Sequence, residues 1–169
     1  VGLDAGTFTN KDLLFAQDNT RILSGLYGLL RPMDIIMPYR LEMGTKLKTN
    51  RGTSLYDFWS TLISKLLNDE LVSHEKNIII NCASVEYFKA VNMRILKAEV
   101  VTPVFKEIRN GKPRIISFFA KRARGAMARY IITNQINDID GIISFDLDNY
   151  SYNESLSSRY EPVFTRYSA

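Results

Sequence analysis

The sequence predicts a mixed α/β fold with flanking helices, and three observations carry that prediction. Short β-branched runs alternate with longer segments of helical periodicity. The pair Asn110-Gly111 separates two strand-like runs, which is typical of a β-hairpin because its turn needs positive φ twice. The length of 169 residues suits one domain with its own core. We therefore expect a single domain over residues 1–169, with one antiparallel hairpin at about residues 98–119.

The composition is that of an ordinary globular protein, with 46% hydrophobic and 24% charged residues. The apolar runs are far too short to span a bilayer, so we expect no membrane attachment and a cytoplasmic location. Cys82 is the single cysteine and His74 the single histidine, which leaves no internal disulfide and few soft metal ligands. We expect no metal site and no cofactor.

The first part of the chain has a helical pattern. Thr9 can cap a helix start, with Asp12 at the third position of a capping box. Apolar residues at helical spacing then continue over 13–26, broken by Gly25 and Gly28. The two glycines predict a close helix contact, because a residue without a side chain lets another backbone approach.

A short strand is expected next, at residues 38–44. Tyr39, Leu41 and Met43 alternate there with Arg40 and Glu42, and alternation is typical of a half-buried strand. Arg40 and Glu42 would share one face and could pair.

The middle of the chain predicts a helix, a strand and a second helix start. Ser54 and Asp57 form a capping-box pattern, and apolar residues over 55–67 form one buried stripe. The β-branched run 77–82 predicts a buried strand. Ser84 follows as a plausible cap of a short helix.

The last third of the chain predicts one long helix and two strands. The helix is expected from about Ala120 to Asn134. The strands are expected at Gly141–Phe145 and Tyr160–Arg166, with a polar loop over 146–158 between them.

The net charge of +4 hides a strong asymmetry. Residues 1–88 have a net charge of −1, whereas residues 89–130 contain 11 Lys/Arg against 2 Asp/Glu, a net charge of +9. Residues 131–169 have a net charge of −4. Such a block indicates a surface for an anionic partner, or a solvated face covered by acids from elsewhere in the chain.

A phosphate-bearing partner fits this block best. Cations at the start of a helix are costly unless something negative lies against them. We predict phosphate contacts with a nucleic acid from the long helix and from the tip of the hairpin, without base-specific readout. The predicted contact residues are Lys121, Arg122, Arg124, Arg129, Arg109 and Lys112.

An enzyme acting on a nucleobase or nucleotide is the alternative, with its site in a polar crevice at strand ends. Its acid–base residues would be Arg40, Glu42, Glu86 and Lys121, and its crevice would include Tyr39, Asn81, Ser84 and Lys89. Simple helix capping explains Ser84 equally well. His74, the single histidine, is expected at a helix end, where the role of a helix C-terminal cation suits it better than a Ser-His-Asp set, so the residues favour a non-enzymatic protein.

Five motifs in order resemble the YaaA family of peroxide-stress proteins. They are Ile22–Pro32, Pro38–Gly44, Leu55–Trp59, Ala83–Phe88 and Ile116–Gly125. The resemblance implies a family-specific α/β fold and a cytoplasmic bacterial protein that protects against hydrogen peroxide. It also implies lower free intracellular iron, and binding of double-stranded DNA through a positively charged cleft and a helix-hairpin-helix element. Family members begin with a portion that this chain lacks, so the chain is similar to their C-terminal part.

Overall fold

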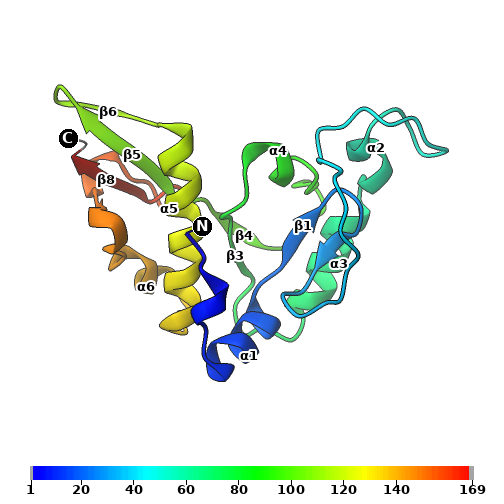
Figure 1. Ribbon diagram of the computed structural model, residues 1–169, viewed down its shortest axis with the longest axis horizontal. Coiled ribbons are helices and arrows are strands. Elements are labelled where there is room, and N and C mark those ends of the chain that lie inside the picture. Colours follow the sequence, from blue (N-terminus) through cyan, green and yellow to red (C-terminus); the bar gives the residue numbers. More distant parts are fainter. Residues whose placement is uncertain (1, 168–169) are drawn as a thin grey trace. The chain divides into compact units, whose positions relative to one another are not determined.

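The computed structural model describes residues 2–167 and confirms the mixed α/β class (Figure 1). Its contacts cluster in two compact units. Unit 1 consists of Val1–Leu13, Ile78–Cys82 and Val100–Ala169, and unit 2 of Leu14–Asn77 and Ala83–Glu99. The expectation of a single domain stays a prediction. No helix in the described range is long and apolar enough to cross a bilayer.

Unit 1 is built on a four-stranded sheet in the order β6-β5-β8-β7. The strands are β5 (Val104–Arg109), β6 (Lys112–Arg114), β7 (Ser151–Tyr152) and β8 (Val163–Tyr167). β5 pairs antiparallel with β6 and parallel with β8, and β7 pairs antiparallel with β8. The sheet is therefore mixed, as expected. The predicted strand over Tyr160–Arg166 is β8, with a start three residues later.

The predicted hairpin is confirmed at β5–β6. Asn110 (φ 50°) and Gly111 (φ 71°) both have positive φ, as a tight hairpin turn requires. Its strands are shorter than the predicted 98–119, because residues 99–101 form a separate strand. That strand, β4 (Glu99–Val101), pairs with β3 (Ile78–Ile80), which lies inside the predicted strand over 77–82.

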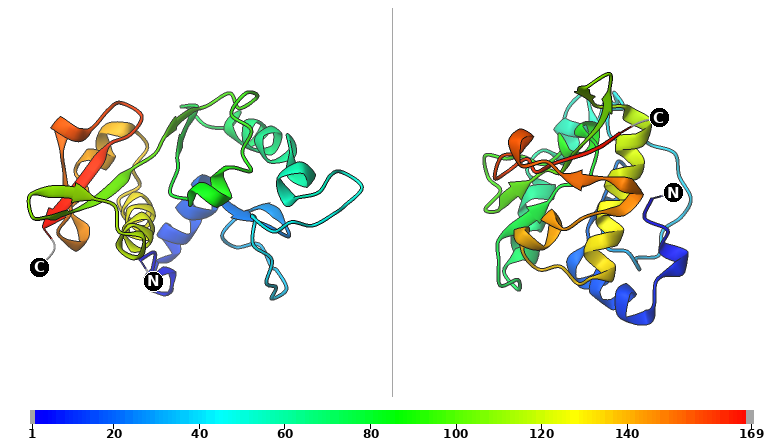
Figure 2. Two further views of the ribbon diagram at one scale, coloured as in Figure 1. Left: turned by 90° about the horizontal axis from the view of Figure 1, so that it is seen from above. Right: turned by 90° about the vertical axis from the view of Figure 1, so that its left-hand side faces the viewer.

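The long helix α5 (Ser117–Thr133) begins earlier than the expected Ala120. Ile116 precedes it in an extended conformation, so the apolar run 115–120 turns into helix almost at once. α5 lies against β5 (Figures 1 and 2). It packs Ala123 and Met127 into the core of unit 1. The same core contains the rings of Phe105, Phe145 and Phe164, which contact one another at centroid distances of 5.5–5.7 Å.

The predicted strand at Gly141–Phe145 is wrong, because these residues form α6 (Ile139–Ile143). The Asp138 side chain caps the helix by accepting the Gly141 N–H at 2.8 Å. Ile142 and Phe145, three apart, are both buried in the core, which is a helical spacing. The expected polar loop over 146–158 contains the short elements η2 (Leu147–Asn149), β7 and η3 (Glu154–Leu156). The first short element of unit 1 is η1 (Ala5–Thr7).

Unit 2 begins within α1 (Asn10–Asn19), where the Thr9–Asp12 capping box is present as predicted. The expected continuation of the helix over 22–26 is wrong. These residues enter the antiparallel hairpin β1 (Ile22–Ser24) and β2 (Gly28–Leu30) instead. Gly28 has φ +75°, and a side chain on it would meet the Trp59 ring at 2.7 Å. The glycines therefore serve a turn and a close ring contact, not helix packing.

The Ser54–Asp57 capping box is confirmed, but the helix that it starts is broken at Ser60 (φ 39°). It forms α2 (Leu55–Trp59) and α3 (Leu62–Leu71) in place of one continuous stripe. The predicted strand at residues 38–44 is also wrong. The Thr45 N–H closes a turn to the Glu42 carbonyl, and the Gly44 N–H bonds to the Glu86 side chain, so these groups make no strand ladder. The last helix of unit 2 is α4 (Val85–Phe88).

Candidate nucleic-acid interface

The four predicted cations of α5 do not lie in its first turn. Because the helix begins at Ser117, Lys121 and Arg122 fall in the second turn, and Arg124 and Arg129 fall further on. The field of a helix end fades within about one turn. The electrostatic cost that we expected for these cations is therefore small.

Arg122 is partly neutralised within unit 1. Its Nε and Nη2 donate to the two carboxylate oxygens of Asp148 at 3.0 and 3.1 Å, a two-point contact. The Arg122 side chain remains 54% exposed. Arg122 is therefore covered by an acid from the end of the chain, which is the alternative to a partner surface that the charge pattern left open.

Arg129 holds the start of the chain against α5. Its Nη1 donates to the carbonyls of Leu3 and Asp4 and to the Thr7 hydroxyl, and its guanidinium lies over the Phe8 ring at 5.4 Å. These contacts already occupy Arg129. Its main role in the described structure is packing.

Arg124 is half-buried, and its Nε donates to the Ala120 carbonyl one turn earlier. Lys121 is exposed and has no ion pair among the described residues. Of the four helix cations, Lys121 is thus the one most open to a partner.

The hairpin places further cations on the same side of the sheet as α5. Arg109 pairs across the turn with Lys112, and Glu107 pairs with Arg114, so these four share one face of the hairpin. That face faces the core, because Phe105 and Glu107 on it are buried. Arg109, Lys112 and Arg114 lie beyond the core and are exposed.

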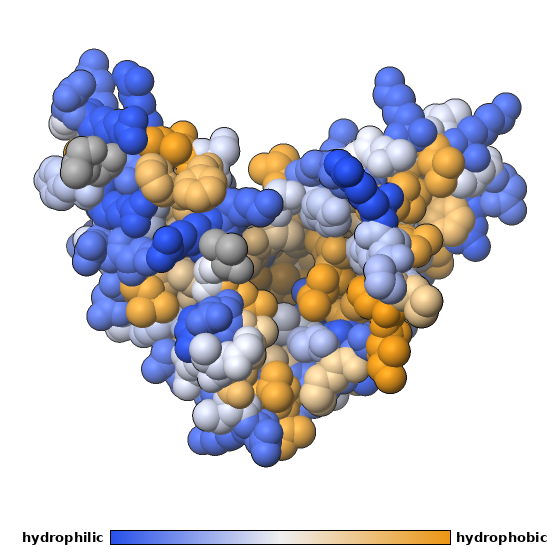
Figure 3. All heavy atoms as spheres, viewed as in Figure 1, coloured by the Kyte–Doolittle hydropathy of each residue, from blue (hydrophilic) through white to orange (hydrophobic). Residues whose placement is uncertain are grey.

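We call Arg109, Lys112, Arg114 and Lys121 the hairpin–helix surface. In Figure 3 the tip of the β5–β6 hairpin, at upper left, is hydrophilic. Exposed apolar side chains lie between the tip and Lys121 along the chain, with Ile115 at 61% and Phe118 at 71% exposure. The surface thus combines cations with an exposed ring, two features of surfaces that bind nucleic acid.

The acid of the hairpin is buried in a charge network that the sequence did not predict. Glu107 is 1% exposed, and its carboxylate accepts from Arg166 Nε at 2.8 and 3.0 Å and from the Tyr150 hydroxyl. Arg166 also donates to the Asp148 carbonyl and lies over the rings of Phe119 and Tyr150. Burial, followed by the bond to Glu107, raises the pKa of Tyr150. Glu107 is therefore neutralised by Arg166 inside the unit, although the exposed Arg114 lies opposite it on β6.

Unit 1 has a small net charge, but its basic and acidic residues fall in different segments of the chain. The unit contains 11 Lys/Arg and 9 Asp/Glu, a net charge of +2. The carboxylate within the hairpin is the buried Glu107, whereas six of the acids belong to residues 138–161. The exposed charged side chains of the hairpin are therefore all positive.

The predicted crevice residues are divided between the units. Asn81 and Lys121 belong to unit 1, and the others belong to unit 2. Asn81 is 8% exposed, and its amide donates to the Thr102 hydroxyl, a contact inside the fold.

Within unit 2, the crevice residue Tyr39 and the predicted acid–base residues Glu42 and Glu86 lie near Tyr87. The pKa of Tyr87 is raised by burial first, and then by the nearby Tyr39, Glu86 and Glu42. Glu42 and Glu86 are exposed, and so is Arg40. Glu42 and Glu86 thus lie near Tyr87 within unit 2, and the alternative of an enzyme stays a prediction.

The remaining crevice residues have structural contacts. Ser84 caps α4 by accepting the Tyr87 N–H at 3.3 Å, as the capping interpretation predicts. The Lys89 ammonium lies 4.9 Å from the centre of the Tyr56 ring.

Cys82 is half-buried, and burial raises the pKa of its thiol to about 12.

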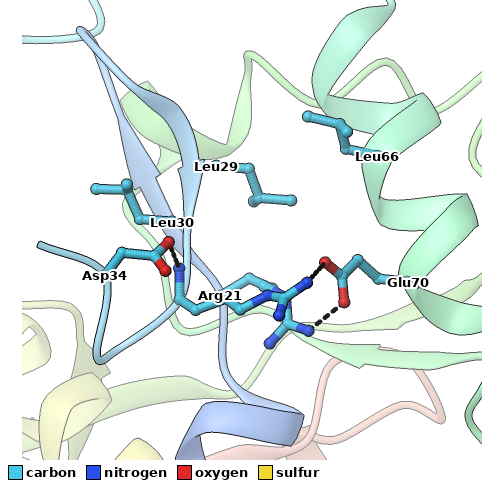
Figure 4. A pocket seen from close by; sticks show the side chains of 7 residues that line it. Arg21, Leu29, Leu30, Asp34, Leu66 and Glu70 are labelled. Atoms are coloured by element: carbon cyan, nitrogen blue, oxygen red, sulfur yellow. Dashed lines mark hydrogen bonds and ion pairs between the residues drawn. The ribbon is translucent and has the colours of Figure 1, made fainter.

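A pocket of unit 2 that the sequence did not predict is shown in Figure 4. Glu70 accepts from both Arg21 and Arg31, and the two arginines hold the pKa of Glu70 below its usual value. Leu29, Leu30 and Leu66 supply the apolar lining. Arg21 also donates to the carbonyls of Gln17, Asp18 and Thr20 at the end of α1, so we interpret its charge as structural.

Within residues 2–167 no cluster of His, Cys, Asp and Glu could hold a metal ion.

The family comparison decides the relationship of the chain. The family model described as "Peroxide stress protein YaaA" matches residues 1–156. The chain belongs to the YaaA family.

Curated relatives support this membership of the YaaA family. A UPF0246 protein of Saccharophagus degradans is 54% identical over 166 residues, which are 98% of this chain and 65% of the relative. UPF0246 proteins of Shewanella oneidensis and Aliivibrio fischeri are each 52% identical over the same 98% of the chain, and 65% and 64% of their lengths are covered. The chain therefore spans slightly less than two thirds of these relatives.

Proposed function

We propose that this part of a YaaA-family protein binds double-stranded DNA through phosphate contacts made by the hairpin–helix surface. The observation that carries the proposal is the hairpin face. Lys112 and Arg114 are exposed there, and the carboxylate beside them, that of Glu107, is buried and paired with Arg166. Phosphate oxygens are the chemical partners that such unneutralised cations favour.

The contact residues that we propose differ in part from the predicted ones. Lys121, Lys112 and Arg109 keep their predicted role, and Arg114 joins them. Arg122 is secondary because Asp148 competes for it, and Arg129 is occupied by the start of the chain. Contacts to phosphate alone give affinity without sequence preference, and that affinity falls steeply with salt.

The setting of this activity is also a proposal. The family description concerns peroxide stress, and we propose that DNA binding in the cytoplasm serves that response. A protein that covers phosphates competes with other ions at the DNA surface, iron included. The link to lower free iron stays a prediction.

A charge-reversal pair tests the proposal. Lys112→Glu with Lys121→Glu removes two exposed cations from the hairpin–helix surface. The matched control is Lys11→Glu with Lys76→Glu, two exposed lysines elsewhere that change the net charge equally. Affinity for a fluorescent DNA duplex is measured by anisotropy over a range of salt concentrations, and circular dichroism verifies folding.

We expect the surface pair to lose at least about tenfold in affinity and to flatten the plot of log affinity against log salt by about 1.8, since each phosphate contact contributes about 0.9. The control pair keeps the slope. Equal losses in the two pairs would mean that only total charge matters, and no loss in the surface pair would refute the site. Reversal of Arg122 is a poorer test, because a new carboxylate would lie against Asp148 and disturb the fold.

A further inference from the structure

A short segment of unit 2 exposes four apolar side chains. Met33, Ile35, Ile36 and Met37 are 49%, 100%, 42% and 75% exposed. We call these four residues the apolar strip. Single exposed apolar residues are ordinary, but four within five positions are a local cluster, and clusters of exposed apolar side chains mark interfaces.

The apolar strip is held in place by polar side chains. The Met33 N–H donates to the Gln17 side chain at 2.9 Å, and the Met37 N–H donates to the Tyr27 hydroxyl at 3.1 Å. Both bonds fix an otherwise irregular segment at its ends. The strip is therefore already ordered, so binding of a partner would cost little conformational entropy.

The pocket of Figure 4 adjoins the apolar strip in the chain. Arg31 and Asp34, which line the pocket, flank Met33. Leu66 in the same lining is 47% exposed. The Nε of Arg21 is buried and has no acceptor in the described part of the chain. A docking segment could supply apolar side chains to the lining and the strip, and a carbonyl oxygen to that donor.

We propose that the apolar strip is the docking surface for the portion of a YaaA-family chain that lies outside the residues matched here. The match to the first curated relative covers 98% of this chain but only 65% of the relative. A third of such a protein has no counterpart in these 169 residues and needs apolar surface to pack on. The proposal is independent of DNA binding.

The test compares this chain with a chimera in which the Saccharophagus degradans relative keeps its own unmatched portion and carries this chain over the matched residues. Hydrogen–deuterium exchange is followed in peptides that cover residues 33–37. We expect exchange to be at least about tenfold slower in the chimera at every protein concentration. Equal exchange would overturn the proposal. Protection that appears in this chain alone as its concentration rises would also overturn it, in favour of a second copy as the occupant.

Two variants test the proposal by melting temperature, without hydrogen–deuterium exchange. Ile35→Lys should leave the melting temperature of this chain unchanged, because Ile35 is fully exposed here, and should lower that of the chimera by about 5 °C. The control Val72→Lys, at a residue 85% exposed, should change neither. An Ile35→Lys effect that is the same in both proteins would refute the docking site. If the chimera does not fold, the intact relative is used, and rapid exchange at its positions matched to 33–37 would refute it equally.

Discussion

Replacing Glu107 with Gln tests the buried charge network of unit 1. The carboxylate is 1% exposed and accepts two bonds from Arg166 and one from Tyr150. Gln keeps the volume and one acceptor oxygen but removes the negative charge. The guanidinium of Arg166, whose side chain is only 18% exposed, would then be left without its counter-ion.

The expected loss in the free energy of unfolding is about 3 kcal/mol, at the lower end of the range for breaking one partner of a buried ion pair. The lower end applies because Arg166 keeps its bond to the Asp148 carbonyl and its contacts with two aromatic rings. The control Glu161→Gln removes an exposed carboxylate of the same unit and should change stability by no more than about 0.5 kcal/mol.

Urea unfolding followed by circular dichroism measures the loss. Trp59, the single tryptophan, belongs to unit 2, so its fluorescence reports separately on that unit. We expect the midpoint of the dichroism transition to fall for Glu107→Gln. Adding Arg166→Met should cost less than the sum of the single changes, because both charges are then gone. A loss below about 0.5 kcal/mol in Glu107→Gln would refute the role given to the network.

The remaining predictions concern Glu70 and Cys82. Arg21 and Arg31 lower the pKa of Glu70 below 4.5, so its contribution to stability is complete above that pH and is lost as the pH falls through the lowered value. Glu70→Gln should therefore destabilise the protein at pH 7 and flatten the decline below pH 4.5 in acid titrations, and an unchanged acid limb would contradict this. A rise in the pKa of Cys82 from 9.0 to about 12 lowers its thiolate fraction at pH 8 about a thousandfold. Labelling by a disulfide reagent should accordingly be far slower in the native protein than in urea, whereas rapid native labelling would reveal a reactive thiol.

Features set by a few neighbouring residues were predictable from the sequence. The Ser54–Asp57 capping box and the turn at Asn110-Gly111 are present as predicted. In the capping box two side chains bond to the backbone at the helix start, and in the turn Asn110 and Gly111 adopt positive φ, so neighbouring residues suffice in both. The error over 22–26 shows the limit of such patterns, because packing of Trp59 against Gly28 decides that turn and lies 31 positions along the chain.

Features that depend on distant pairing could not be predicted. The parallel pairing of β5 with β8 brings Arg166 to Glu107, which is 59 positions away in the chain. No local pattern marks either residue as buried, and charged residues are rarely buried unless paired. A larger separation, 126 positions, hid the bond of Arg129 to Leu3, so a residue predicted to contact DNA is occupied within the fold.

Asp148 connects the buried network to the basic helix. Its φ of 57° is a left-handed conformation that aspartate tolerates better than most residues. In that conformation its carbonyl accepts from Arg166 while its carboxylate binds Arg122 on α5. One residue of the acidic end of the chain thus serves two arginines, one structural and one at the edge of the proposed DNA site. We place the candidate site at the hairpin and the start of α5 rather than along the whole helix, because Asp148 binds Arg122 and the start of the chain occupies Arg129.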